Sequence, residues 1–125
     1  MVQNVDGLRM GLRNCPPGHS SRSSSLHNLA TSLRDRFKLK GVLSDLDEAI
    51  DMYRAALALR STGHSFRSLS LNSLANGLRD RFKQRGVLSD LDEVIELHRA
   101  ALALRSPGHS GRSLSLNNLA IALQD

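Results

Sequence analysis

The sequence repeats itself at a fixed interval, and this constrains the fold more than any other feature. Gly-His-Ser occurs at residues 18–20, 63–65 and 108–110, so the period is about 45 residues. The octapeptide Gly-Val-Leu-Ser-Asp-Leu-Asp-Glu at 41–48 returns unchanged at 86–93. Such a period predicts an array of similar units, each of which buries its apolar surface against the next.

The period also divides the chain. We predict a degenerate partial repeat at residues 1–15, which corresponds to the second half of a unit, then repeat 1 at 16–60 and repeat 2 at 61–105. Residues 106–125 correspond to a truncated repeat 3 that contains only a first helix. Without the helix that would cover it, this segment is expected to leave apolar surface open to self-association.

Apolar residues within each repeat follow helical spacing. The predicted first helix of repeat 1 carries an apolar stripe at Leu26, Leu29, Ala30, Leu33 and Phe37, which returns in repeat 2 at Leu71, Leu74, Ala75, Leu78 and Phe82. The predicted second helix of repeat 1 carries its stripe at Leu46, Ile50, Tyr53 and Leu57. Two such helices in succession predict a helical hairpin.

Short polar residues and glycines mark the ends of these helices. We expect Ser44 to cap the second helix of repeat 1, because serine accepts a hydrogen bond from the first turn, and Gly63 to end that helix. Ser20 or a neighbour is expected to cap the first helix, while the repeated histidine fills the joint between units.

The composition agrees with an all-α protein, since aromatic residues make up 3% of the 125 residues and β-branched residues are scarce. Cys15 is the one cysteine, so an internal disulfide is excluded and a reducing, cytoplasmic location is expected. No apolar run has the length of a membrane span, and we expect no membrane association.

The stripe residues resemble the tetratricopeptide signature. Leu26, Ala30 and Leu33 stand at its tryptophan, glycine and tyrosine positions, and Tyr53 stands at the phenylalanine position between two alanines. The sequence is similar to the long-repeat variety of kinesin light chains, found also in fungal multidomain proteins. The resemblance implies an α-solenoid of antiparallel hairpins in a right-handed superhelix. HEAT and armadillo units have a similar period but fit the leucine–alanine spacing less well.

The same resemblance implies a non-enzymatic scaffold that binds an extended protein or peptide, or a partner helix, in a groove lined by the first helices. The residues in register with the groove's central ladder are Asn28, Ser73 and Asn118. The residues that flank this ladder are His27, Thr31, Asn72, Asn76, Asn117 and Ile121. Asparagine suits the role because its short side chain both donates and accepts hydrogen bonds.

The sequence gives little support for catalysis or metal binding. A histidine beside a serine in every repeat does not make a catalytic triad, and equivalent residues of stacked hairpins lie about 10 Å apart, too far to share a metal ion. We therefore expect no enzyme activity, metal or cofactor.

The basic residues have two explanations. Arg22, Arg67 and Arg112 fall in first turns, where each either contacts the preceding helix or contributes to an anion contact. The net charge of +5 leaves a basic module for nucleic acid as the alternative function. However, acidic residues interrupt the basic clusters, and exposed aromatic residues for base stacking do not recur.

Overall fold

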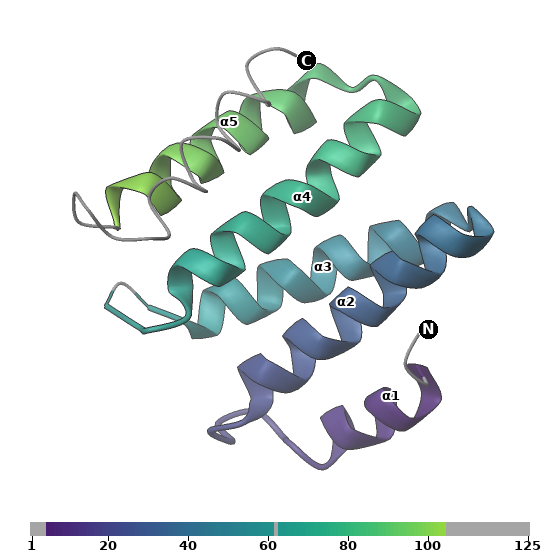
Figure 1. The fold of residues 1–125 in the computed structure, drawn as a ribbon. Helices are drawn as coiled ribbons and strands as arrows, with labels where there is room; N and C mark the ends of the chain where they lie inside the picture. Colours follow the sequence, from purple (N-terminus) through teal and green to yellow (C-terminus); the bar gives the residue numbers. More distant parts are fainter. Residues whose placement is uncertain (1–4, 62, 105–125) are drawn as a thin grey trace. The chain divides into compact units, whose positions relative to one another are not determined.

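The computed structural model describes residues 5–61 and 63–104, and all regular secondary structure in these ranges is α-helical (Figure 1). The chain divides into two compact units, residues 1–61 and 62–125. The helices of the first unit are α1 (Val5–Arg13), α2 (Arg22–Lys40) and α3 (Leu43–Leu59). Those described in the second unit are α4 (Arg67–Arg85) and α5 (Leu88–Ala103). The predicted all-α class is therefore confirmed for the described residues.

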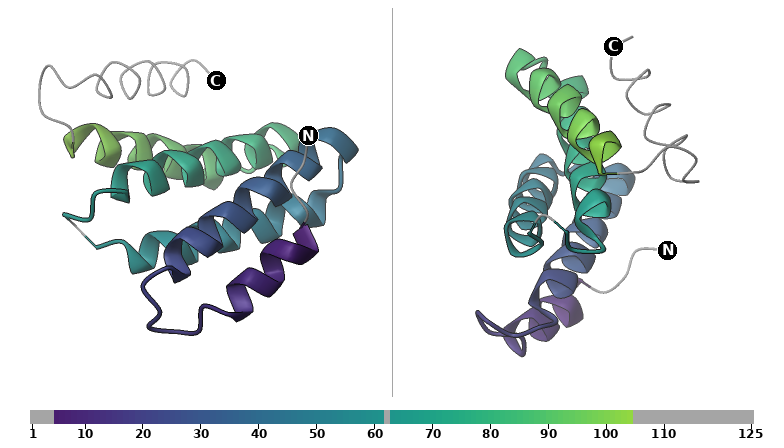
Figure 2. Two further views of the ribbon diagram at one scale, coloured as in Figure 1. Left: turned by 60° about the horizontal axis from the view of Figure 1, so that its bottom comes forward. Right: turned by 90° about the vertical axis from the view of Figure 1, so that its left-hand side faces the viewer.

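In the first unit, α2 and α3 form an antiparallel hairpin, and α1 packs against α2 (Figure 2). The apolar stripes predicted from helical spacing meet in this hairpin. Leu33, Leu46 and Ala49 have no exposed surface, and Ile50 and Tyr53 are almost fully buried. Leu57, which we expected in the same stripe, is half-buried near the end of α3.

The second unit repeats the hairpin with α4 and α5, which lie side by side in Figure 2. Leu74 and Leu78 of α4 pack in a core that also contains Val94 of α5, and all three are 0–1% exposed. Phe82 is half-buried, whereas its counterpart Phe37 is buried. The antiparallel hairpin is thus the structural unit in both halves, while the superhelix and the repeat boundaries stay predictions.

A left-handed glycine joins the two helices of each hairpin. Gly41 has φ 71° and Gly86 has φ 68°. Their backbone N–H groups donate to the carbonyl oxygens of Phe37 and Phe82, each at 2.7 Å. Glycine adopts a positive φ at little steric cost, so it closes the last turn of the first helix and redirects the chain at once.

The predicted ends of the second helix were wrong. Helix α3 begins at Leu43 after Val42, which makes no side-chain capping bond, and Ser44 falls inside the first turn. At the other end, α3 stops at Leu59, and Arg60 caps it by donating its backbone N–H to Leu57 O at 3.0 Å. The positive φ of Gly63 therefore serves the turn that follows and does not end the helix.

None of the helices in the described residues is long and apolar enough to cross a membrane. The predicted first helix of repeat 3 lies outside the described residues, as do Arg112, Asn117, Asn118 and Ile121.

Candidate interaction surface

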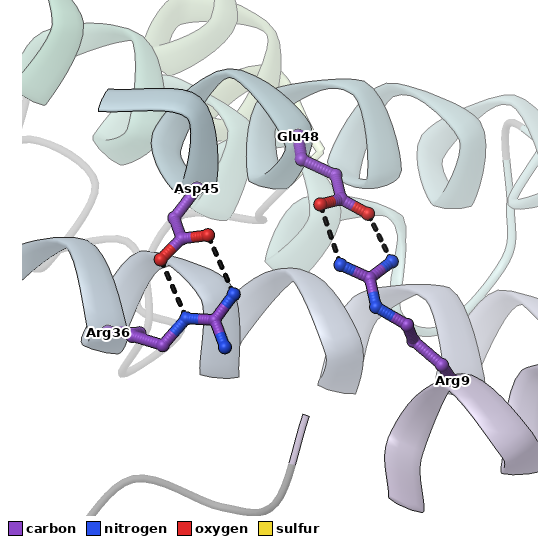
Figure 3. Close-up of polar contacts among 4 residues, drawn as sticks. All are labelled: Arg9, Arg36, Asp45 and Glu48. Carbon is purple, nitrogen blue, oxygen red and sulfur yellow. Dashed lines mark hydrogen bonds and ion pairs between the residues drawn. The ribbon is translucent and has the colours of Figure 1, made fainter. Parts of the chain in front are cut away.

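A bidentate ion pair links the two helices of each hairpin. Arg36 of α2 donates from Nε and Nη2 to the Asp45 carboxylate of α3, at 2.7 and 2.8 Å (Figure 3). Arg81 and Asp90 make the same pair in the second hairpin, with both distances 2.9 Å. Two parallel bonds fix the guanidinium and carboxylate planes against each other, and thereby the relative rotation of the two helices.

The electrostatics of the first pair follow from this contact. The hydrogen bonds from Arg36 lower the pKa of the Asp45 carboxyl and outweigh the opposing effect of its burial. Neither pair was predicted from the sequence, although an arginine and an aspartate nine positions apart occur in each repeat. Arg36 and Arg81 are therefore engaged in fixing the fold.

A third ion pair attaches the short helix α1. Arg9 of α1 binds the Glu48 carboxylate of α3 through both Nη atoms, and the Nη2–Oε1 distance is 2.8 Å (Figure 3). Figure 3 shows that Asp45 and Glu48 extend from the same helix, yet they meet arginines from two different helices. The bonds from Arg9 lower the pKa of Glu48. This contact joins α1 directly to α3, beyond its packing on α2.

Two predicted groove residues contact the second helix of the first hairpin. The rings of His27 and Tyr53 meet edge to face, with centroids 5.5 Å apart. Thr31 Oγ1 lies 3.1 Å from the backbone oxygen of His27, to which it donates, and 2.9 Å from Tyr53 Oη. Because a threonine hydroxyl carries one proton, Tyr53 donates to Thr31 in this arrangement. Both side chains thus belong in part to the hairpin contact.

Among the side-chain atoms of the described residues, His27 Nδ1 is buried and has no hydrogen-bond partner. Burial lowers the pKa of the His27 imidazole, and the charge of Arg60 lowers it further. Arg60 is itself 2% exposed, with Nε 3.3 Å from Ser23 Oγ and Nη2 3.4 Å from Ser24 Oγ. The burial of Arg60 was not predicted from the sequence.

The predicted ladder residues differ in accessibility. Asn28 is exposed on α2, whereas its counterpart Ser73 and the flanking Asn76 are half-buried on α4. Asn72 is buried, and its Oδ1 lies 3.2 Å from His98 Nδ1 inside the second hairpin. Asn28 is therefore the ladder position with an open amide in the described chain.

The loops before α2 and α4 show what the repeated histidines do. His19 Nδ1 accepts the backbone N–H of Ser21 at 3.0 Å, and His64 Nδ1 accepts that of Phe66 at 3.1 Å. Both histidines are exposed. His19 therefore does not fill the joint between α1 and α2 as expected, while the expectation for His64, at the boundary of the two units, stays a prediction. The N-cap residue of α2 is Ser21, a neighbour of Ser20 as expected, but its side chain makes no capping hydrogen bond.

The first-turn arginines were assigned two alternative roles. Arg22 donates from Nη1 to the backbone oxygen of Cys15 at 2.8 Å, just beyond the end of α1. This is the contact toward the preceding helix that the sequence suggested, while the anion contact stays a prediction. Arg67, in the equivalent position, is half-buried.

Within the ranges that the structure describes, histidine, cysteine and acidic side chains form no group of three placed to hold a metal ion. The polar contacts described above instead join helices and close turns. They hold the helices of each hairpin together and leave part of α2, including Asn28, exposed to solvent.

The geometry defines a protein of repeated antiparallel helical hairpins. Residues 22–63, which comprise α2, α3 and the following turn, match the sequence model of the tetratricopeptide repeat family. Searches of curated proteins and of solved structures gave no match. The family match supports a tetratricopeptide-like repeat protein.

Proposed function

We propose that this protein is a non-enzymatic scaffold that binds an extended peptide or a partner helix along the open face of its first helices. Tetratricopeptide repeats generally mediate contacts between proteins, and residues 22–63 match that family. The kinesin light chain-like variety and a cytoplasmic location are part of the same proposal.

The observation that carries the proposal is the exposed amide of Asn28 on a helix whose rotation is fixed from both ends of the hairpin. Arg36 pairs with Asp45 near the turn, and Arg60 contacts Ser23 and the α2 first turn at the opposite end. A side chain held on a rigid helix loses little conformational freedom when it binds. Asn28 is thus well placed to hydrogen-bond a peptide backbone, through one donor and one acceptor group.

A basic module that binds nucleic acid is the second candidate, supported by the net charge of +5. Three of the arginines that contribute to this charge, Arg9, Arg36 and Arg81, are paired with carboxylates inside the units. Pairing leaves the net charge unchanged, but these three guanidinium groups are held by carboxylates and are less available to a phosphate backbone. This is why we favour the protein scaffold.

The test is a selection of displayed random peptides of about 12 residues against the full chain, followed by affinity measurement for the selected peptides. We expect Asn28→Ala to weaken them about five- to tenfold, because one hydrogen-bonding side chain is lost. Asn14→Ala, at an exposed residue after α1, is the matched control and should change nothing.

Circular dichroism of both variants checks that the helices are intact. Equal affinity of wild type and Asn28→Ala for every selected peptide would contradict the assignment of Asn28. Binding partners that are lost on nuclease treatment would favour the nucleic-acid alternative.

A further inference from the structure

The turn that joins the helices of each hairpin exposes apolar and basic side chains together. We define the hairpin tip of the first unit as Lys38, Leu39, Lys40, Val42 and Leu43. The equivalent tip of the second unit is Lys83, Gln84, Arg85, Val87 and Leu88. These residues surround the left-handed glycine, and all ten are exposed.

The apolar members of the tips are unusually open for residues of their kind. Leu39 is 69% exposed and Leu88 is 70% exposed, although Leu33 of α2 and Val94 of α5 have no exposed surface. Exposed apolar side chains that gather at one place, beside polar residues, mark interaction sites more often than single scattered ones do. The same Val-Leu pair is exposed in both repeats, as Val42-Leu43 and Val87-Leu88.

Helix stability does not account for these residues. Val42 and Val87 occupy the N-cap positions of α3 and α5 and make no side-chain capping bond. Valine is among the poor N-cap residues, and a serine, threonine, asparagine or aspartate there stabilises a helix by about 1 kcal/mol relative to an apolar residue. The tips thus keep an apolar surface where a polar residue would serve the fold better.

The charge of the tips is positive. Lys38 and Lys40 in the first unit are exposed, and the nearby Asp45 carboxylate is held by Arg36. In the second unit the Asp90 carboxylate is likewise held by Arg81. A partner that complements each tip therefore brings carboxylates for the cations and apolar side chains for the Val-Leu pair.

We infer that the hairpin tips dock an acidic amphipathic helix of a partner protein. Its apolar side chains cover Leu39 and Leu43, and its carboxylates pair with Lys38 and Lys40. A lipid surface is a poorer match, because anchoring to anionic membranes generally requires a cluster of four to eight cations, roughly, and each tip has two. This surface is separate from the Asn28 face and does not depend on the proposed peptide groove.

The test uses the full chain and a fluorescent helical peptide of about 18 residues, with leucines at helical spacing and glutamates elsewhere. Binding is followed by fluorescence anisotropy. We expect Leu39→Ser to weaken the complex about tenfold, because the variant lacks the apolar surface that Leu39 would bury against the peptide. The double variant Lys38→Gln/Lys40→Gln should weaken it about fivefold and reduce its salt dependence.

The second tip provides a gain-of-binding variant. Gln84 stands where the first tip has Leu39, so Gln84→Leu should strengthen binding about threefold. Met10→Ser and Arg13→Gln are the matched controls, since both residues are exposed on α1, away from either tip sequence. Neither control should change the affinity, and Asn28→Ala should also have no effect.

Several results would overturn the inference. One is equal binding of a peptide in which glutamine replaces every glutamate, and another is an equal loss of binding in Met10→Ser. Binding to vesicles with about 30% phosphatidylserine that depends on Leu39, without binding of the acidic peptide, would assign the tips to a lipid surface instead. Absence of peptide binding at concentrations of about 1 mM would also reject it.

Discussion

The α2–α3 and α4–α5 hairpins place different side chains at equivalent positions of their helix–helix contact. In the first hairpin, His27 meets Tyr53 edge to face, and the tyrosine hydroxyl reaches Thr31. In the second, the histidine is on the other helix, where His98 Nδ1 contacts Asn72. The two hairpins therefore differ in which helix supplies the histidine, and a hydrogen-bonding distance to its Nδ1 is present in the second hairpin.

The ion pairs and the glycine turns, by contrast, are the same in both hairpins. Arg36–Asp45 and Arg81–Asp90 have matching bidentate geometry, and Gly41 and Gly86 have nearly equal φ angles. The glycine turn and the arginine–aspartate ion pair are therefore the features that the two repeats share. The side chains of the mid-helix contact, by contrast, differ between the two hairpins at both equivalent positions.

The largest expected effect comes from exchanging one member of this contact. His98→Tyr should destabilise the chain by about 2 kcal/mol, because a larger ring enters a site where His98 is 1% exposed and Asn72 loses its partner. The double variant Asn72→His/His98→Tyr reproduces the His27–Tyr53 pair of the first hairpin and should recover about 1 kcal/mol.

Urea unfolding followed by circular dichroism measures both variants. If the costs of Asn72→His and His98→Tyr simply add, the two positions are not coupled and the comparison between the hairpins loses its physical basis.

The next effect concerns the shared ion pair. Asp45→Asn and Asp90→Asn should each cost about 1–2 kcal/mol, because a charge-assisted bidentate contact is replaced by a weaker one. The cost should be greater at Asp90, since the Arg81 side chain is 23% exposed and the Arg36 side chain is 35% exposed. Water screens the more exposed pair more strongly.

Urea unfolding gives the total cost, and hydrogen exchange of the two hairpins shows where it falls. Asp51→Asn and Asp92→Asn replace exposed carboxylates on the same helices as controls and should stay within about 0.5 kcal/mol of wild type. Equal losses in these controls would show that helix charge, and not the ion pair, is responsible.

The smallest effect is a pH dependence carried by the two histidines of the variable contact. Burial lowers the pKa of His98, with a further contribution from Arg79, and burial also lowers the pKa of His27. The unfolded chain then binds protons that the folded chain does not, below the ordinary histidine value of about 6.5. The free energy of unfolding is therefore highest above that pH. Protonation of the two histidines in the unfolded chain lowers it by less than about 1 kcal/mol between pH 7 and 6.

Urea midpoints measured across this pH range test the sign. His98→Gln should reduce the slope more than His27→Gln, because His98 is buried and His27 is half-buried. A wild-type stability that increases on acidification in this range would contradict the assignment.

Much of the fold followed from spacing along the sequence. Leu29, Leu33 and Leu74 recur at helical intervals, and these residues form the cores of the hairpins. Helix ends were less well predicted, because Ser44 and Gly63 are residue types that cap or end helices in many contexts. In the structure, Val42 is the N-cap residue of α3 and Arg60 is its C-cap residue.

The candidate surface could be predicted only in part. Asn28 is exposed as expected, but Asn72 has an equally suitable side chain and is buried against His98. The two asparagines occupy positions one residue apart in the repeat register, which differ by about 100° around a helix. Which of them faces solvent depends on how the helix is rotated, and local spacing does not fix that rotation closely enough.

The sequence by itself determined that the described chain forms helices, that they pair as hairpins, and that a glycine follows the first helix of each pair. These properties depend on periodicity and on backbone preferences, which act over a few residues. Only the tertiary structure decided that Arg36 meets Asp45, that Arg9 reaches Glu48 and that Arg60 is buried. Long side chains select among several oppositely charged or polar neighbours, and the selection depends on the distance and rotation of helices once they have packed.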